Sequence, residues 1–135
     1  MPIKLYLFVE AALKAGIFKD ILVYARFSNG LGSITLLHGI SLIMSQLVSN
    51  VPYTVMMLPV MKPLTNDVLW LSLASSSTLA GNATIIGAMA NLIVIEAASG
   101  SKIKIGFLEF FKIGIVTTGL TFVVSILILW GYSCF

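Results

Sequence analysis

The chain has 135 residues, of which 59% are hydrophobic and 10% are charged. Soluble domains have about 45–50% apolar and about 25% charged residues, so this composition indicates a protein whose outer solvent is lipid. The net charge of +3 comes from scattered residues, and the single cysteine, Cys134, has no partner within the chain. These features argue against nucleic-acid binding and against a disulfide or zinc framework.

The first two predicted elements are a partial transmembrane helix over residues 1–16 and an interfacial helix over residues 17–30. The apolar run at residues 5–13 is shorter than the roughly 20 residues that a helix needs to cross a bilayer, so we expect the chain to begin inside a membrane element. Residues 17–30 mix charged and apolar side chains, which is typical of a helix that lies in the interface. Glu10 precedes Lys14 by four residues, so it is a candidate proton or cation carrier or one half of a helical ion pair.

A re-entrant helical hairpin is predicted over residues 31–62. The stretch from Phe27 to Met61 contains no Asp, Glu, Lys or Arg and is too long for one crossing. Ser49–Pro52 should interrupt it, because proline lacks an amide hydrogen and disfavours helical geometry in the preceding residue. The following residues, Tyr53–Met61, would reach only about 13 Å, half a bilayer at most. An ordinary loop between two helices is the alternative.

A discontinuous transmembrane helix is predicted over residues 68–99, and a plain spanning helix over residues 107–131. In the first, Gly81–Thr84 separates two halves of about 18–21 Å, which span a bilayer together but not separately. A packing kink made by small residues is the alternative. The last helix is apolar from Ile113 onward and has Trp130 near its far end, where amphipathic rings favour the interface.

The residues at the two predicted breaks have the chemistry of an ion site. Backbone groups exposed at a break are costly in lipid unless a protein group, water or an ion satisfies them. Helix N-termini favour anions, whereas C-terminal carbonyls and hydroxyls suit a hard cation such as Na+. Neutral oxygens, amides and a flexible backbone come from Ser49, Asn50, Gly81, Asn82 and Thr84. This arrangement is typical of a transporter site near the bilayer midplane.

His38, on the first arm of the predicted hairpin, is the other candidate ionisable residue. It could titrate near neutral pH or form hydrogen bonds within the helix bundle, and we favour the second interpretation. The sequence contains no nucleotide loop, metal-ligand cluster or nucleophile–base arrangement. We therefore predict neither an enzyme nor a cofactor, and no metal beyond Na+ at the two breaks.

Four stretches carry a resemblance to a known family: Leu47–Pro52, Leu58–Pro59, Ala80–Asn91 and Phe107–Phe110. They are similar to the ion transporter superfamily, which includes arsenical pump membrane proteins, NhaD-type sodium/proton antiporters, citrate transporters and divalent-anion symporters. The similarity covers nearly the whole chain and matches only the second, C-terminal, inverted repeat of that family. The order of the motifs is fairly specific for the superfamily, and it selects no substrate.

The resemblance implies that the hairpin tip and the helix break form one half of a substrate and cation site. The implied site residues are Ser49, Asn50, Val51, Gly81, Asn82, Ala83 and Thr84. The other half would lie in a first repeat, supplied by a separate chain or by a second copy of this one. Some members have Ser-Asn-Thr at the tip, whereas this sequence has Val51 and then Pro52, which favours the arsenite, antiporter or other anion-permease branches over dicarboxylate transport.

These observations predict an all-α integral protein of the plasma membrane that contains only the second inverted repeat. Its expected role is as a fragment or subunit of a secondary active transporter for a small inorganic or organic anion or for Na+, coupled to Na+ or H+. The expected partners are the lipid bilayer and the missing repeat or a homo-oligomer. The alternative function is a non-transporting remnant or small membrane subunit that folds only with a partner.

Overall fold

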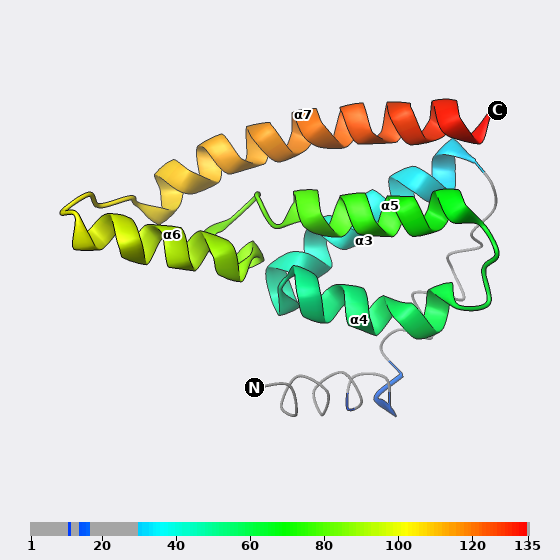
Figure 1. Cartoon of the computed structure of the whole chain (residues 1–135), viewed down its shortest axis with the longest axis horizontal. Coiled ribbons are helices and arrows are strands. Elements are labelled where there is room, and N and C mark those ends of the chain that lie inside the picture. The colour runs from blue at the N-terminus through cyan, green and yellow to red at the C-terminus, as the bar shows by residue number, and fades with distance from the viewer. Residues whose placement is uncertain (1–10, 12–13, 17–29, 135) are drawn as a thin grey trace.

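The described part of the chain contains helices and no strands. The computed structural model describes residue 11, residues 14–16 and residues 30–134 (Figure 1). Its elements in chain order are α3 (Leu31–Val48), α4 (Asn50–Met61), α5 (Asp67–Ala80), the 3₁₀ turn η1 (Ile85–Gly87), α6 (Met89–Gly100) and α7 (Phe107–Ser133). The prediction of an all-helical protein is confirmed for these residues. The predicted partial helix at 1–16 and the predicted interfacial helix at 17–30 fall mostly outside them.

Helices α3 and α4 form a hairpin whose turn is the single residue Ser49. Its φ of 68° and ψ of 160° strain a residue that has a side chain, and this conformation ends α3. Pro52 falls in the first turn of α4, where its missing N–H is not needed. The sequence predicts a break over Ser49–Pro52, but the structure resumes the helix at Asn50, because a proline fits the first turn of a helix.

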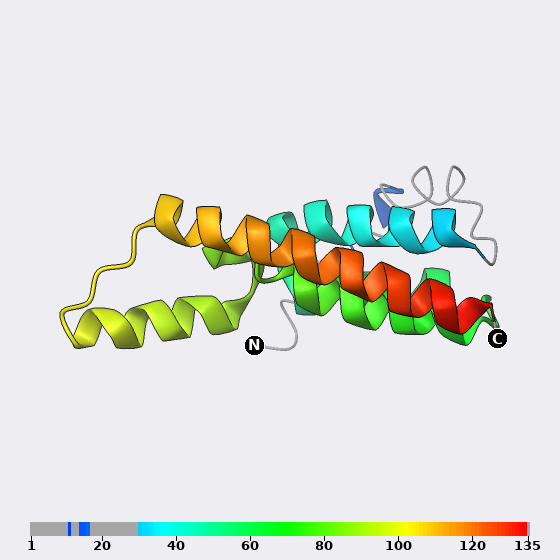
Figure 2. The same cartoon turned by 90° about the horizontal axis from the view of Figure 1, so that it is seen from above.

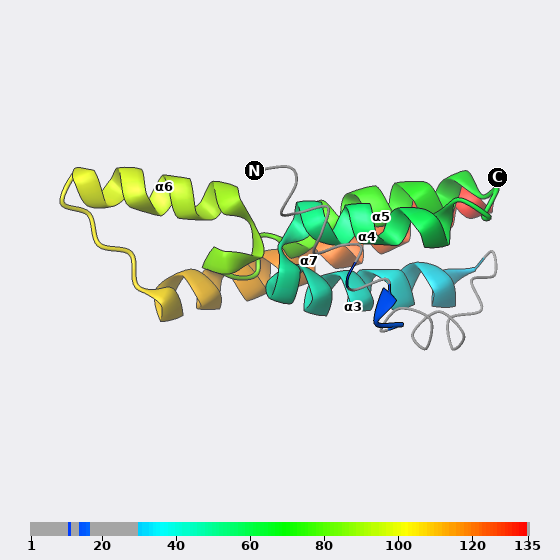
Figure 3. The ribbon, with the colours of Figure 1, turned by 90° about the horizontal axis from the view of Figure 1, so that it is seen from below.

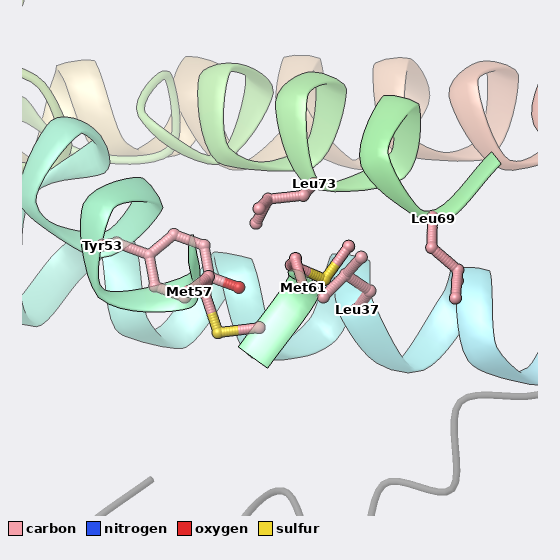
Figure 4. Packing of buried hydrophobic residues seen from close by; sticks show 6 residues of the cluster. All are labelled: Leu37, Tyr53, Met57, Met61, Leu69 and Leu73. Atoms are coloured by element: carbon pink, nitrogen blue, oxygen red, sulfur yellow. The ribbon is translucent and has the colours of Figure 1, made fainter. Parts of the chain in front are cut away.

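The hairpin packs against α5 through a buried cluster. Tyr53, Met57 and Met61 of α4 lie beside Leu37 of α3 and Leu73 of α5 (Figure 4). The cluster is completed by Leu69 of α5. All six side chains are at most 2% exposed. In lipid such packing is favourable through close van der Waals contact, because apolar burial gains nothing over acyl chains.

Helices α5 and α6 follow one another along α7, which runs in the opposite direction (Figure 1). The segment Gly81–Ala88, which includes η1, separates them. α5 packs on α3, α4 and α7, whereas α6 contacts mainly η1 and buries none of its side chains. Figure 2 shows α6 diverging from α7 toward the connection at residues 101–106. The bundle therefore has a packed end around α5 and an open end around α6.

Two of the described helices, α3 and α7, are long and apolar enough to cross a membrane. α7 has 27 residues, or about 40 Å, which exceeds the roughly 30 Å of a bilayer core. The other helices have 12 to 14 residues, or about 18–21 Å. With the apolar composition, these lengths are those of a membrane protein that combines long helices with half-length ones.

Candidate functional site

One side chain, Gln46, connects the two helix breaks. It lies on α3 one turn before Ser49, and its Nε2 donates to the backbone carbonyl of Ala80, the last residue of α5, over 2.8 Å. Its Oε1 accepts from the hydroxyl of Thr84 over 2.5 Å. Figure 3 shows the end of the α3–α4 hairpin beside η1. Gln46 therefore holds the end of the hairpin against the last residue of α5 and against the middle of the second break.

Asn91, in the first turn of α6, satisfies backbone carbonyls within the second break. Its Nδ2 donates to the carbonyl of Gly81 over 2.8 Å and to that of Thr84 over 3.0 Å. The Thr84 hydroxyl in turn accepts from the backbone N–H of Gly87 over 3.1 Å. Lipid cannot supply donors for these carbonyls, so amide side chains supply them. The break thus has a defined shape.

Two glycines allow the break to pack closely. A Cβ added at Gly87 would lie 2.7 Å from Oε1 of Gln46. A Cβ added at Gly114 of α7 would lie 2.8 Å from the carbonyl oxygen of Ala83 and closer still to that of Asn82. Backbone carbonyls cannot rotate away from such a contact. Gly114 is therefore the point at which α7 supports the second break.

The predicted residues of the hairpin tip lie at the surface of the bundle. Ser49 and Asn50 are half-buried, and Val51 is 60% exposed. The side-chain oxygen of Asn50 accepts from the backbone N–H of Val51 over 2.9 Å, while its carbonyl accepts from the Thr54 hydroxyl over 2.9 Å. The Asn50 oxygen is therefore engaged within the first turn of its own helix, and α4 has no side-chain cap.

The predicted residues of the second break divide into two groups. Gly81, Ala83 and Thr84 are buried, whereas the side chain of Asn82 is exposed. The structure thus brings Thr84 to the hairpin through Gln46 and leaves Asn82 at the rim.

Ser45 is a buried hydroxyl that the sequence argument missed. It is 0% exposed, and its Oγ has no hydrogen-bond partner within the described part of the chain. Other helical hydroxyls here donate to the carbonyl four residues earlier, as Thr35 and Ser72 do. Ser41 and Ser45 are four residues apart, so they share one face of α3, and Ser49 follows at the same spacing just beyond the end of the helix. This spacing was the available sequence signal, and an unpaired buried hydroxyl asks for an explanation such as a water or an ion.

The polar groups around the two breaks are neutral. No Asp, Glu, Lys or Arg lies between Leu31 and Met61 or between Val68 and Ile95. In the residues that the structure describes, no three His, Cys, Asp or Glu side chains gather as a metal site. Hydroxyl, amide and carbonyl groups of this kind suit a hard cation or a hydrogen-bonded anion.

The two candidate ionisable residues are not at the breaks. His38 lies eight residues before Gln46 on α3, where its Nδ1 is 2.9 Å from the Ile34 carbonyl oxygen and its Nε2 is 3.0 Å from the hydroxyl of Ser125 on α7. It hydrogen-bonds within the bundle, as we favoured from the sequence. Glu10 lies outside the described residues.

Three named proteins are similar in sequence to this chain. A Mycobacterium tuberculosis protein named as an uncharacterized transporter is 31% identical over 137 residues, which cover 93% of this chain and 32% of that protein. A Dictyostelium discoideum protein that carries the name transporter arsB is 40% identical over 86 residues, or 63% of this chain and 15% of that protein. The human P protein is 34% identical over 92 residues, or 62% of this chain and 11% of that protein. The chain belongs to the ion transporter superfamily.

The chain spans about a quarter to a third of the length of the mycobacterial relatives that cover most of it. No family model and no solved structure matches it. The relatives' names describe transport and membrane location, in agreement with the membrane-protein composition and the apolar helices. The prediction of a transport protein in a membrane is thereby supported.

Proposed function

We propose that this chain supplies one half of the substrate and coupling-ion site of a secondary active transporter. The transporter would be of the arsenite/anion-permease type or of the Na+/H+ antiporter type and would lie in the plasma membrane. The observation that carries the proposal is that Gln46 of α3 and Asn91 of α6 join four helix ends at the two breaks. They are the C-terminal ends of α3 and α5 and the N-terminal ends of α4 and α6.

The lengths of the helices support a site at membrane depth. α4 has 12 residues, or about 18 Å, which cannot cross about 30 Å of hydrocarbon. We therefore treat α3 and α4 as a re-entrant hairpin, and α5 with α6 as a discontinuous transmembrane helix. The 14 residues of α5 place the second break about 21 Å beyond Asp67. A break at that depth is tolerated only where protein groups or an aqueous cavity satisfy the backbone.

The four helix ends give the site two kinds of ligand. The N-terminal ends of α4 and α6 offer free N–H groups and partial positive charge to an anion. The hydroxyl of Ser45 on α3 and that of Ser49 at the hairpin turn offer oxygens to a hard cation. In the described arrangement the amides of Gln46 and Asn91 occupy the carbonyls of the second break. Cation binding there would have to displace those amides, which links ion binding to movement of α6.

The proposed function requires further transporter segments. The Mycobacterium tuberculosis relative named as a transporter is about three times as long as the part that this chain matches. We propose that a first repeat, from another chain or from a second copy, supplies the other half of the site. The alternative is a segment that folds with a partner but transports nothing. This alternative would be favoured if all the variants below reduced transport without any change in ion binding.

Ser45→Ala tests the proposal most sharply, because it separates the site from the fold. Removing an unpaired buried hydroxyl should leave stability unchanged or raise it, since no hydrogen bond is lost. Loss of a cation ligand should weaken ion binding by about 1–3 kcal/mol, or roughly fivefold to a hundredfold. Uptake of radiolabelled sodium and of arsenite would be measured in membrane vesicles that contain the natural assembly, with Leu47→Ala, which is 73% exposed on α3, as the control.

Asn50→Ala and Asn82→Ala extend the test to the predicted break residues. Each should raise the half-saturating concentration of sodium or arsenite, whereas Val55→Ala on α4 should not. The proposed site would be refuted if all three variants, Ser45→Ala, Asn50→Ala and Asn82→Ala, gave wild-type saturation curves. A decrease in both stability and binding for Ser45→Ala would instead show a packing role.

A further inference from the structure

The connection between α6 and α7, residues 101–106, is exposed and alternates basic with apolar side chains. It lies at the end of the bundle opposite to the C-terminus (Figure 1). Lys102 and Lys104 are each followed by an isoleucine, Ile103 and Ile105, and all four side chains are exposed. Exposed basic and apolar side chains in one short segment suit the boundary between lipid acyl chains and headgroups, where each kind finds its own solvent.

The length of α7 places this connection outside the hydrocarbon core. Trp130, near the other end of α7, is 45% exposed and marks one interface. A core of about 30 Å takes about 20 helical residues, which reach back from Trp130 to Phe110. A helix tilt of about 20° adds only about one residue to that length. Residues 101–108 therefore lie at the depth of the headgroups, and Lys112 is close enough to extend its ammonium group to them.

The basic charge at this end is not neutralised within the described part of the chain. Three exposed lysines form no ion pair among the described residues: Lys102, Lys104 and Lys112. The carboxylate of Glu109 accepts from the backbone N–H of Gly106 over 3.2 Å. Residues 101–112 thus contain three lysines and one glutamate, a net charge of +2. The connection between α4 and α5 differs, because Lys62 at its start and Asp67 at its end give no net charge.

Lys102 has a backbone conformation that normally selects glycine. Its φ is 63°. The N–H of Lys102 donates to the carbonyl of Ser99 and that of Ile103 to the carbonyl of Ala98, each over 3.0 Å. These two bonds are those of a Schellman motif, in which Lys102 occupies the left-handed position after α6. A side chain is unfavourable there, so a lysine in place of glycine points to a use for its charge.

An aromatic pair gives the same surface an apolar contact area. Phe107 and Phe111 are one turn apart on α7, and their rings stack with centroids 6.3 Å apart and planes 7° from parallel. Both rings are exposed, as is the neighbouring Leu108. Apolar side chains at the start of α7 favour the outer part of the acyl layer, which keeps the nearby lysines at the level of the lipid phosphates.

We propose that residues 101–112 bind the phosphate groups of anionic phospholipids. The three lysines supply ammonium donors at the level of the phosphates, while the aromatic pair and the two isoleucines enter the acyl boundary. Each lysine close to an anionic surface is worth about 1 kcal/mol, or about fivefold in affinity, at low ionic strength. The surface lies at the open end of the bundle, and its lipid binding does not depend on the site at the helix breaks.

The lipid preference of the full chain tests the proposal. Spin-labelled phosphatidylglycerol and phosphatidylcholine would be compared in phosphatidylcholine bilayers, by the share of each label that protein contact immobilises in electron paramagnetic resonance spectra. We expect phosphatidylglycerol to be preferred, and added salt to weaken the preference by screening. The double variant Lys102→Gln/Lys104→Gln should lower the preference about twofold or more, because only some of the surrounding lipids contact this surface. Lys62→Gln is the control and should leave it unchanged.

Three outcomes of this comparison would overturn the proposal. They are equal association of the two lipids with the wild-type chain, an unchanged preference in the double variant, and an equal fall in Lys62→Gln, which would show an effect of net charge alone.

Two substitutions of Lys102 separate its charge from its backbone conformation. The unfolding midpoint of the wild-type chain should be higher in nanodiscs that contain phosphatidylglycerol than in phosphatidylcholine alone. This difference should shrink in Lys102→Gly, which removes the charge, and persist in Lys102→Arg, which keeps it. Relief of the left-handed strain, and any effect of the charge on the end of α6, act in both lipids and cancel in the difference. The same difference in all three proteins would contradict a role of Lys102 in lipid binding.

Discussion

The two helix breaks are built in different ways. The first is one residue long and depends on local features, the positive φ of Ser49 and the position of Pro52 in the first turn of α4. The second extends over Gly81–Ala88. Asn91 of α6 donates to two of its carbonyls, and Gln46 of α3 accepts from the Thr84 hydroxyl and donates to the Ala80 carbonyl just before the break. A short break can be held by local sequence, whereas a long one needs donors from elsewhere because lipid supplies none. We therefore expect the second break to be sensitive to distant substitutions.

The largest effect is expected from Gly114→Ala on α7. The new methyl group would lie against the carbonyl oxygens of Asn82 and Ala83, so α7 would have to move away from the second break. We expect the free energy of unfolding to fall by about 2–3 kcal/mol, measured by thermal unfolding in nanodiscs. Gly119→Ala on the same helix meets nothing within 4 Å and should be neutral or slightly stabilising. Equal effects of the two variants would refute the close contact.

The next largest effect is expected from Gln46→Leu, which keeps the size of the side chain but removes its polar end. It would leave the Ala80 carbonyl and the Thr84 hydroxyl without the bonds that join them to the hairpin. Hydrogen bonds between membrane helices are worth about 0.6 kcal/mol on average and about 1.7 at most, so the loss should be about 1–3 kcal/mol. Leu47→Ala is the exposed neighbour and should cost much less. Similar unfolding midpoints for both would mean that Gln46 does not connect the breaks.

A smaller effect is expected from Asn91→Ala, because the residue is only half-buried and its two acceptors belong to the same break. We expect a loss of about 1 kcal/mol and faster amide hydrogen exchange at Gly81–Ala88, since local opening follows the loss of local bonds. Ile93→Ala on α6 is the control, because Ile93 is 65% exposed. Exchange that accelerates equally in both variants would place the effect in α6 as a whole.

Local sequence was sufficient to predict where helices stop, and it was insufficient to predict what satisfies the breaks. Proline and glycine act on their own backbone, so Pro52 and Gly81 marked both interruptions. The contact between Gln46 and Thr84 joins residues 38 positions apart, and the contact of Gly114 with the second break depends on how α7 packs. Neither has a local signature. The four-residue spacing of Ser45 and Ser49 was visible in the sequence, but the lack of a hydrogen-bond partner for the Ser45 hydroxyl among the described residues was not.

The smallest effect, and one of opposite sign, is expected from Ser49→Gly at the first break. A backbone with φ 68° and ψ 160° is nearly confined to glycine and costs another residue about 1–3 kcal/mol. Glycine would remove this strain, but it loses about 0.5–1 kcal/mol more conformational entropy on folding. The net result should be an increase in the free energy of unfolding of about 0.5–1 kcal/mol, whereas Ser99→Gly within α6 should lower it by a similar amount. If both variants are destabilised alike, Ser49 does not hold a strained conformation. If Ser49→Gly is more stable but binds sodium or arsenite less well, the first break keeps its strain because the serine hydroxyl is needed at the tip.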